Sequence, residues 1–501
     1  MGGLRIRKNI RDLKPTEMDN LIRAFHHIMN VLPVTDNNSY WKLAGYHGVP
    51  APFYCYHGVV LFPTWHRAYL LQLENALRSA PGCGNDVTMP YWDEIAAINQ
   101  TEGLPKIFTT KEYRYSYGKG SIPNPLFSYK FGAGVDDRGD MEHGVNDPSR
   151  YSKHKGYSTV RYPYSGLVGL AEDRERTVKH NSDVDGKGDT HAVDAPNYTV
   201  FSNTTSADAY NETHKDSQAE PTAVSLEAPH NAIHMAVGGW EVPGRSEKEG
   251  TPNVYPDANG DMGENETAAF DPLFWFHHAW TDRTFWEWQM LHGATDRLEF
   301  VKGDPGTKNP VEGQPDLTVD SPLTPFKYGL GTRNERAMTT KDVVNIKTLG
   351  YDYAGLDRPR AALPPKDEGF KLSVMGINRA VIPGGFMVTL WSLDTNGQER
   401  LLHIELFLGR WKKEACDNCM NHLMANTFLQ LPKMPTADDL SRAGGGSGGS
   451  GEGGIVLPTF YAKMHTRDAP GGKKLDIGVG ISCLSRELRA FGDMAVRGFG
   501  L

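Results

Sequence analysis

The sequence predicts a mainly α-helical core with long loops, followed by a smaller all-β, antiparallel, sandwich-like domain. Three observations carry this prediction. Apolar residues recur at helical spacing in the first 355 residues, a stretch rich in proline and charge covers residues 356–367, and β-branched, alternating runs fill residues 368–501. We therefore divide the chain into a core at 1–355, a linker at 356–367 and a β domain at 368–501.

Three long helices are expected in the core, where they would form a bundle. The first follows Pro15, the second runs from about Phe62 to Ser79, and the third begins after Asp271 and Pro272. Between the second and third helices, residues 110–220 are polar, rich in Gly and Tyr, and show no regular period. Loops of this length usually carry function or cover a site.

The β domain contains five runs with strand character, at residues 370–377, 384–393, 401–411, 455–465 and 474–484. A Gly-rich tract at 443–454 interrupts them, and its composition predicts a flexible connection. Composition alone does not distinguish a natural loop from an engineered joint at this place.

Charge and cysteine content narrow the class of protein. With 53 Lys and Arg against 61 Asp and Glu, the net charge is −8, which argues against nucleic acid or an anionic membrane as the main partner. Five cysteines cannot form a disulfide framework in a chain of 501 residues. The N-terminus is charged where a leader peptide needs an apolar run, and no segment has the length of a membrane span. We expect a cytoplasmic protein.

Histidine is the unusual residue, with 18 in the chain. Three clusters stand out: His47, His57 and His66; then His230 and His234; then the adjacent His277 and His278. The four-residue spacing of the second cluster places both rings on one face of a helix. In the third cluster, only one of the two adjacent rings can point toward a given partner.

Each cluster alone is more often explained by surface or packing roles, but together they supply three plus three imidazoles. An all-imidazole donor set suits copper, zinc, iron or nickel, and two such sets in one core suggest a binuclear centre. The segment from His230 to His234 lacks the glutamate of the zinc-protease pattern H-E-x-x-H, which weakens a hydrolase interpretation. Two imidazole-bound copper ions in a dry aromatic pocket would suit reaction with O₂.

Motifs in the first 355 residues carry a specific resemblance. They are GYHGVP and CYHGVVLFPTWHRAYLLQLENAL within 45–77, PYWDE at 90–94, LEAPHNAIHMAVGGW at 226–240, and DPLFWFHHAWTDRTFWEW at 271–288. In this order they resemble the type 3 copper proteins of the tyrosinase and catechol oxidase family. The resemblance implies a first copper ion held by His47, His57 and His66, and a second held by His230, His234 and His278. It places His277 and Asp282 behind these ligands, where Asp282 would orient an imidazole or buttress the helix.

The resemblance assigns roles to three more residues of the site. Cys55 would form a thioether bond to His57; its ordinary alternative is a buried free thiol. Glu227 and Asn231 would hold a water molecule near the second copper, which could take the proton from an incoming phenol. Their alternative roles are a charge at a helix N-terminus and a plain helix residue.

The end of the core and the β domain also resemble parts of this family. Tyr351, Asp352 and Tyr353 resemble the motif that closes the core, with an N-terminal arginine such as Arg5, Arg7 or Arg11 packed nearby. The β domain resembles the C-terminal shielding domain of latent tyrosinases. Cys416 and Cys419 would then serve copper delivery, although a disulfide, a zinc half-site or two idle thiols give the same spacing. Phe407 and Phe460 are candidates for the aromatic residue that covers the copper site, and both suit the core of the β domain equally well.

The resemblance implies a tyrosinase with two copper ions, which uses O₂ to hydroxylate monophenols and to oxidise o-diphenols to o-quinones, gated by the β domain. The alternatives are a catechol or o-aminophenol oxidase without monophenol hydroxylation, a hemocyanin-like O₂ carrier, and a zinc hydrolase. Small phenols and O₂ are the expected partners, and a homo-oligomer is compatible with this assignment.

Overall fold

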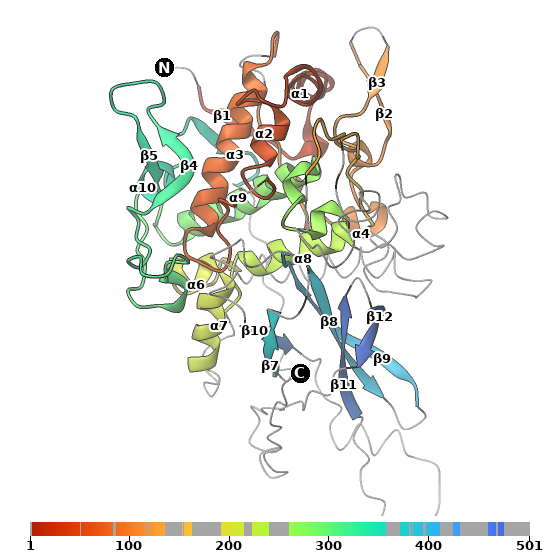
Figure 1. Ribbon diagram of the computed structural model, residues 1–501, viewed down its shortest axis with the longest axis vertical. Helices are drawn as coiled ribbons and strands as arrows, with labels where there is room; N and C mark the ends of the chain where they lie inside the picture. The colour runs from red at the N-terminus through yellow and green to blue at the C-terminus, as the bar shows by residue number, and fades with distance from the viewer. Residues whose placement is uncertain are drawn as a thin grey trace, which may run out of the picture.

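The computed structural model describes residues 3–50, 52–83, 87–117, 120–135, 153, 155–162, 192–214, 223–239, 260–356, 371–379, 382, 384–393, 397–410, 424–430, 459–466 and 469–474. Helices dominate the first part of the chain and strands the last part, and Figure 1 shows strands β7 to β12 gathered on one side of the helical body. Within the described residues, no helix is long and apolar enough to cross a membrane.

Two long helices form the centre of the core. Helix α3 (Phe62–Ser79) packs against α9 (Leu273–Leu291), and both match the helices predicted from the sequence. Helix α9 is buried along most of its length because aromatic residues occupy every side of it. The two helices therefore form a rigid support for side chains that point between them.

Shorter helices surround this pair (Figure 1). The α-helices are α1 (Pro15–His26), α2 (Tyr40–Ala44), α4 (Asn99–Glu102), α6 (Tyr198–Ser202), α7 (Thr204–Thr213), α8 (Glu227–Gly238) and α10 (Thr340–Val343). The single-turn and π segments are η1 (Ile10–Asp12), η2 (His27–Val31), η4 (Lys106–Phe108), η5 (Asp261–Gly263), η6 (Ala268–Phe270) and η7 (Pro305–Thr307).

The stretch at 110–220, which shows no regular period in the sequence, contains several short elements. Strands β2 (Glu112–Arg114) and β3 (Ser121–Pro123) pair antiparallel, and α6 and α7 follow later in the stretch. Asn197 and Asn203 cap the two helices with their side chains. The sequence did not resolve these elements because runs of three to ten residues are too short to show a period.

The two ends of the core meet in a small parallel pair. Strand β1 (Arg5–Arg7) pairs with β6 (Tyr351–Tyr353), so the N-terminal arginines lie beside the tyrosine motif. The guanidinium of Arg7 lies 3.6 Å from the centroid of the Tyr351 ring. Strands β4 (Pro322–Tyr328) and β5 (Arg336–Thr339) form a separate antiparallel pair.

The described part of the β domain is antiparallel, as predicted. Its strands are β7 (Lys371–Asn378), β8 (Phe386–Leu393), β9 (Glu399–Phe407), β10 (Met424–Gln430), β11 (Thr459–Thr466) and β12 (Ala469–Lys474). They form a four-stranded sheet in the order β12-β11-β8-β9 and a pair of β10 with β7. The Gly-rich tract at 443–454 lies outside the described residues, as do Cys416 and Cys419.

Candidate metal centre

The second histidine group lies on two helices that face each other. Helix α8 carries His230 and His234 one turn apart, and α9 carries His278. The Nε2 atom of His230 lies 3.1 Å from that of His234 and 3.3 Å from that of His278. Nitrogen atoms at this separation can share one ion about 2.0 Å from each of them.

The structure separates the roles of the adjacent histidines on α9. His278 turns its Nε2 toward His230, whereas His277 donates from Nδ1 to Glu94 Oε1 at 2.6 Å. Both rings are buried, and His277 lies close enough to the group to belong to the same cluster of possible ligands. The geometry therefore favours His278 as the third ligand and places His277 behind it.

The first histidine group combines a loop with a helix. We call residues 45–61, between α2 and α3, the ligand loop; it carries His47 and His57, and α3 carries His66. The three ring centroids lie 5.2–5.6 Å apart. His47 donates from Nδ1 to the carbonyl of Asn265, and His66 donates to the carbonyl of Phe62. These bonds fix the tautomer of each ring, so its Nε2 keeps the lone pair that a metal needs.

Two observations indicate that the first group fits a metal. The Nε2 atoms of His47 and His66 are buried and have no hydrogen-bond partner in the described structure. A buried nitrogen acceptor without a partner is costly, and a bound ion would remove that cost. Cys55 lies beside His47 and His57, with one ligand atom of each residue within 4.8 Å of the others.

The two groups form one buried cluster. The rings of His66 and His278 stack with centroids 4.5 Å apart, and those of His57 and His230 lie 5.8 Å apart. Burial lowers the pKa of His66 to about 3 and that of His234 to about 4. The imidazoles are therefore neutral at pH 7, which is the form that binds metal.

Asp282 supports the helices that carry the ligands. Its carboxylate accepts hydrogen bonds from Arg67 at 2.5 Å and Arg7 at 3.2 Å, and from the hydroxyls of Tyr351 and Tyr353 at 2.7 Å each. No imidazole is among these partners, so of its two expected roles the structure shows the buttress. Because Arg67 follows His66 on α3, this ion pair fixes α3 against α9.

Glu227 joins the two histidine groups. It begins α8, and its two carboxylate oxygens accept the backbone N–H of Gly58, next to His57, at 2.8 and 3.0 Å. Thr204 donates to the same carboxylate from its N–H and its hydroxyl. Burial raises the pKa of Glu227, although these hydrogen bonds oppose the rise. Asn231 accepts from His230 Nδ1 at 3.0 Å and so orients that ring.

The β domain lies against the second histidine group. Leu408, Met387 and Leu406 of the β domain pack with Ala232 and Met235 of α8. At Gly385 a side chain would come within 2.6 Å of Met235 Sδ, so the backbone approaches α8 closely. The covering surface was not predicted from the sequence, because its apolar residues look like ordinary strand residues.

The two aromatic residues expected over the copper site have different outcomes. Phe407 stacks on Phe386 inside the β domain, with ring centroids 4.6 Å apart, which is its alternative role. Its neighbours Leu406 and Leu408 belong to the apolar cluster that packs on α8. Phe460 pairs with Ser392 in the sheet, and its side chain lies outside the described structure.

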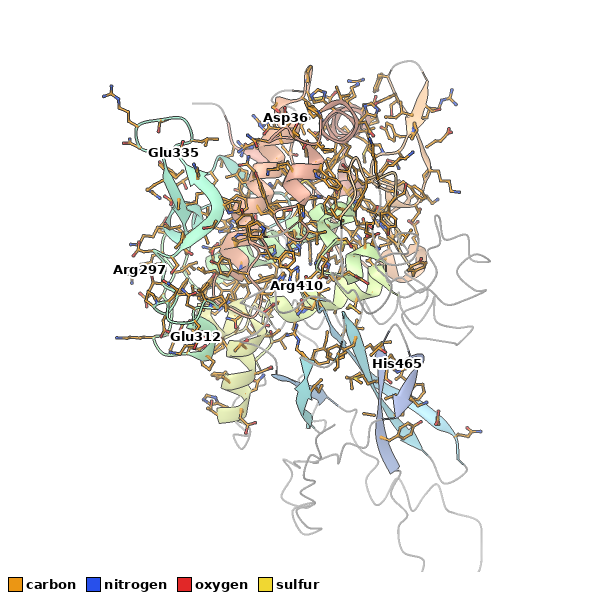
Figure 2. The ribbon with its side chains drawn as sticks, viewed as in Figure 1. Asp36, Arg297, Glu312, Glu335, Arg410 and His465 are labelled. Carbon is orange, nitrogen blue, oxygen red and sulfur yellow. The ribbon has the colours of Figure 1, made fainter. Side chains whose placement is uncertain are left out.

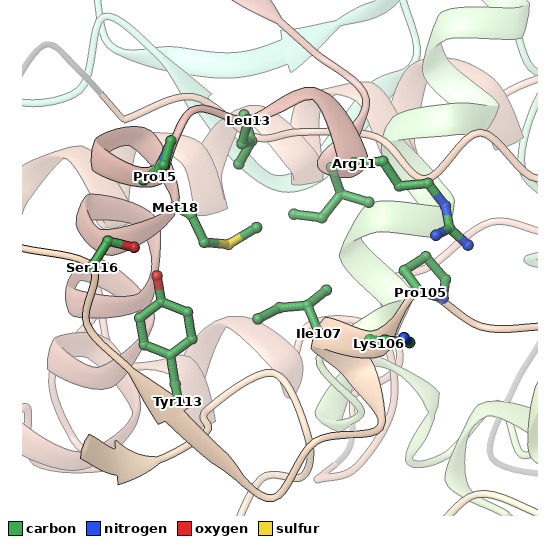
Figure 3. Close-up of a pocket in the computed structure, with 10 residues that line it drawn as sticks. Arg11, Leu13, Pro15, Met18, Pro105, Lys106, Ile107, Tyr113 and Ser116 are labelled. Carbon is green, nitrogen blue, oxygen red and sulfur yellow. The ribbon is translucent and has the colours of Figure 1, made fainter. Parts of the chain in front are cut away.

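A separate surface pocket lies away from the histidines (Figure 3). Its volume is about 390 Å³, and residues of the N-terminal segment and of 105–116 line it, including Ile10, Met18, Ile107 and Tyr113. No histidine lines this pocket, so it is not the site of the metal chemistry.

The similarity of this chain to known proteins agrees with a metal centre built from these histidine groups. The tyrosinase family, described as the common central domain of tyrosinase, matches residues 37–291. A tyrosinase of Aspergillus oryzae is 36% identical over 94% of this chain and 94% of its own. The structure of a tyrosinase from Burkholderia thailandensis is similar with a TM-score of 0.69, at 33% identity, over 93% of this chain and 96% of that one.

A pro-tyrosinase of Aspergillus oryzae has the same fold, with a TM-score of 0.62 at 19% identity over 94% of this chain and 95% of that one. A match over 94% of this chain must extend into residues 368–501. The resemblance drawn from the histidine motifs is confirmed, and the chain belongs to the tyrosinase family.

Proposed function

We propose that this chain is a copper-dependent tyrosinase, which hydroxylates monophenols and oxidises o-diphenols to o-quinones with O₂. His47, His57 and His66 hold one copper ion, and His230, His234 and His278 hold the other. The observation that carries this proposal is the convergence of six neutral imidazoles, five of them buried and His57 half-buried, from the ligand loop and from helices α3, α8 and α9. The tyrosinase family supports copper rather than zinc, and the all-imidazole donor set suits copper.

The bound copper ions would supply the exchange of electrons with O₂. The chain supplies position and a dry environment. Backbone carbonyls fix the rings of His47, His66 and His234, so the ligands need little reorganisation when the metal binds. The ring centroids of Phe274 and His278 lie 4.1 Å apart, and those of Phe62 and His66 lie 4.7 Å apart. These aromatic rings exclude water from the site.

Glu227 and Asn231 manage the substrate proton in this proposal. A carboxylate whose pKa is raised by burial is a better base than an exposed one. With the amide of Asn231 one turn along α8, it holds the water molecule that takes the proton from a phenol. A phenolate is the more electron-rich form, so this step favours attack on its ring.

Two alternatives keep the same six histidines. A catechol or o-aminophenol oxidase would oxidise diphenols only, and a hemocyanin-like carrier would bind O₂ and leave both substrates unchanged. Steady-state assays on a monophenol and on its catechol, combined with metal analysis, distinguish them. We expect about two copper ions per chain and turnover of both substrates. Two zinc ions, or oxidation of neither substrate, would refute the proposal.

The β domain gates the site in this proposal. It covers α8 beside His234, and a pro-tyrosinase with the same fold supports the idea of a latent form. We propose domain limits of 1–355 and 368–501 with a linker between them, and a sandwich arrangement of the two β sheets. Cleavage that removes the residues after 368 is expected to raise the rate of catechol oxidation. An unchanged rate after complete removal would exclude gating.

A further inference from the structure

One side chain of the β domain reaches past the interface into the core. Arg410 follows β9 and is only 2% exposed. Figure 2 shows Arg410 at the helical body, whereas His465 of the same domain lies on the four-stranded sheet. The Arg410 guanidinium therefore lies beside the first histidine group.

Among the described residues, the Arg410 side chain makes two hydrogen bonds and one cation–π contact, all with the ligand loop. Its Nη2 donates to the carbonyl of His47 at 3.1 Å and to Cys55 Sγ at 2.6 Å. Its guanidinium carbon lies 4.6 Å from the centroid of the Phe53 ring. The Arg410 cation thus contacts His47, the first histidine of the ligand loop, and Cys55, which lies two residues before His57.

The backbone that carries Arg410 is held firmly in the β domain. Arg379 donates to the carbonyl of Leu408 at 2.9 Å, and the N–H of Gly384 donates to the carbonyl of Arg410 at 3.2 Å. A side chain at Gly409 would clash with the carbonyl of Gly384, so the two segments cross in close contact. The β domain therefore sets the position of the Arg410 backbone, and the side chain reaches from this fixed point to the ligand loop.

Burying a guanidinium without a carboxylate partner is costly. Among the ion pairs of the described residues, none includes Arg410, whereas Arg7, Arg67 and Arg161 each pair with a buried carboxylate. Its hydrogen bonds go to a carbonyl oxygen and a sulfur atom. An arginine that served only to attach the domain would need neither the His47 carbonyl nor Cys55.

We propose that Arg410 is a positioning residue of the first copper group: it holds the ligand loop in the shape that presents His47 and His57. The β domain then holds the ligand loop of the first histidine group while it covers the second group. This inference rests on the proposed copper site, but the contacts of Arg410 can be tested in metal-free protein. Removal of Arg410 frees the loop, exposes Cys55 and weakens binding of the first copper ion.

The test uses the full-length chain prepared without copper, as wild type, Arg410→Met, Arg410→Lys and the control Lys463→Met. Lys463 pairs with Glu399 on the same domain, away from the ligand loop. The rate of alkylation at Cys55 is followed by peptide mass spectrometry, and copper bound after reconstitution is counted. Circular dichroism verifies the fold, and Arg410→Lys, which keeps the charge but loses the forked donors, decides the outcome if Arg410→Met does not fold.

Arg410→Met is expected to raise the alkylation rate of Cys55 about tenfold, because the loop opens more often. Bound copper should fall from about two ions per chain to about one. Arg410→Lys should lie between Arg410→Met and wild type, and Lys463→Met should match wild type. Alkylation within about twofold of wild type, with copper unchanged, would overturn the proposal. If wild type itself binds no copper, the proposed function fails, while the alkylation rates still decide the role of Arg410.

Discussion

The two histidine groups differ in what holds them. In the second group all three ligands lie on helices, and the Nε2 atoms of His234 and His278 already lie 3.1 and 3.3 Å from that of His230. In the first group only His66 lies on a helix; its ring centroids are 5.2–5.6 Å apart, against 4.5–5.6 Å in the second group. The second group is therefore built by local helical structure, and the first depends on what surrounds its loop.

The supports of the first group come from distant parts of the chain. Asn265 accepts from His47, Glu227 accepts from Gly58, and Arg410 donates to Cys55. Each support belongs to a segment that also contacts the second group or covers it. We therefore expect the second histidine group to tolerate loss of the β domain better than the first.

The largest effect is expected from His278→Ala on the second group. Loss of one of three ligands should leave about one copper ion per chain and lower catechol oxidation by more than about 1000-fold. His277→Ala is the matched control, because His277 bonds to Glu94 and lies behind the ligands. It should keep both copper ions and lose about 10- to 100-fold in activity. Metal analysis and activity assays on both variants test this prediction. If His277→Ala loses a copper ion and His278→Ala keeps both, the ligand is His277.

Asp282→Asn removes the ionic link between the helices of the two groups. Breaking a buried, multiply bonded ion pair should lower the free energy of unfolding by about 3–5 kcal/mol, measured by urea denaturation of metal-free protein. Asp320→Asn is the control, because its pair with Lys341 is exposed, and it should change stability by less than about 0.5 kcal/mol. Equal stability of the two variants would contradict the role of Asp282 as a buttress.

The same variant predicts a dependence on pH. Burial alone would raise the pKa of Asp282, but Arg67, Arg7 and the hydroxyl of Tyr353 together lower it below 3.8. Its stabilising contribution is therefore complete above that value and is lost as the pH falls through the folded pKa. The stability gap between wild type and Asp282→Asn should be constant near neutral pH and shrink in stronger acid. A gap that grows in acid would contradict this assignment.

Glu227→Gln tests the residue that joins the two groups. The amide keeps an oxygen for Gly58 and Thr204 but cannot serve as a base. We expect hydroxylation of a monophenol to fall about 100-fold, with a smaller loss for the catechol, in steady-state assays. Glu112→Gln is a control. Glu112 is exposed, and within the described structure its side chain accepts a hydrogen bond from Ser121. Equal losses for both substrates would assign Glu227 a structural role alone.

Cys55→Ser is expected to have the smallest effect, because it removes a restraint on His57 and no ligand. Copper should stay bound, and catechol oxidation should fall less than about tenfold. If the thioether forms, the copper-loaded wild-type peptide with Cys55 and His57 is lighter by two hydrogen atoms. Cys83→Ser is the control, because Cys83 is buried elsewhere and bonds the carbonyl of Asn20. An unmodified peptide mass in active enzyme would exclude the thioether bond.

The sequence by itself determined the elements with a strong local pattern. The periods of α3 and α9, the four-residue spacing of His230 and His234, and the strands β8 and β9 all appear in the structure. Such patterns are visible because neighbouring residues create them. The order of the histidine motifs was enough to indicate the family.

Only the tertiary structure decided the contacts between distant residues. Glu94 meets His277 across 183 positions, and Arg410 meets Cys55 across 355. Phe407 stacks on Phe386 within the β domain, whereas Leu406 and Leu408 lie in the cluster that packs on α8. No local pattern encodes these choices, because they depend on how helices and sheets pack and on which buried polar groups find partners only in the folded chain.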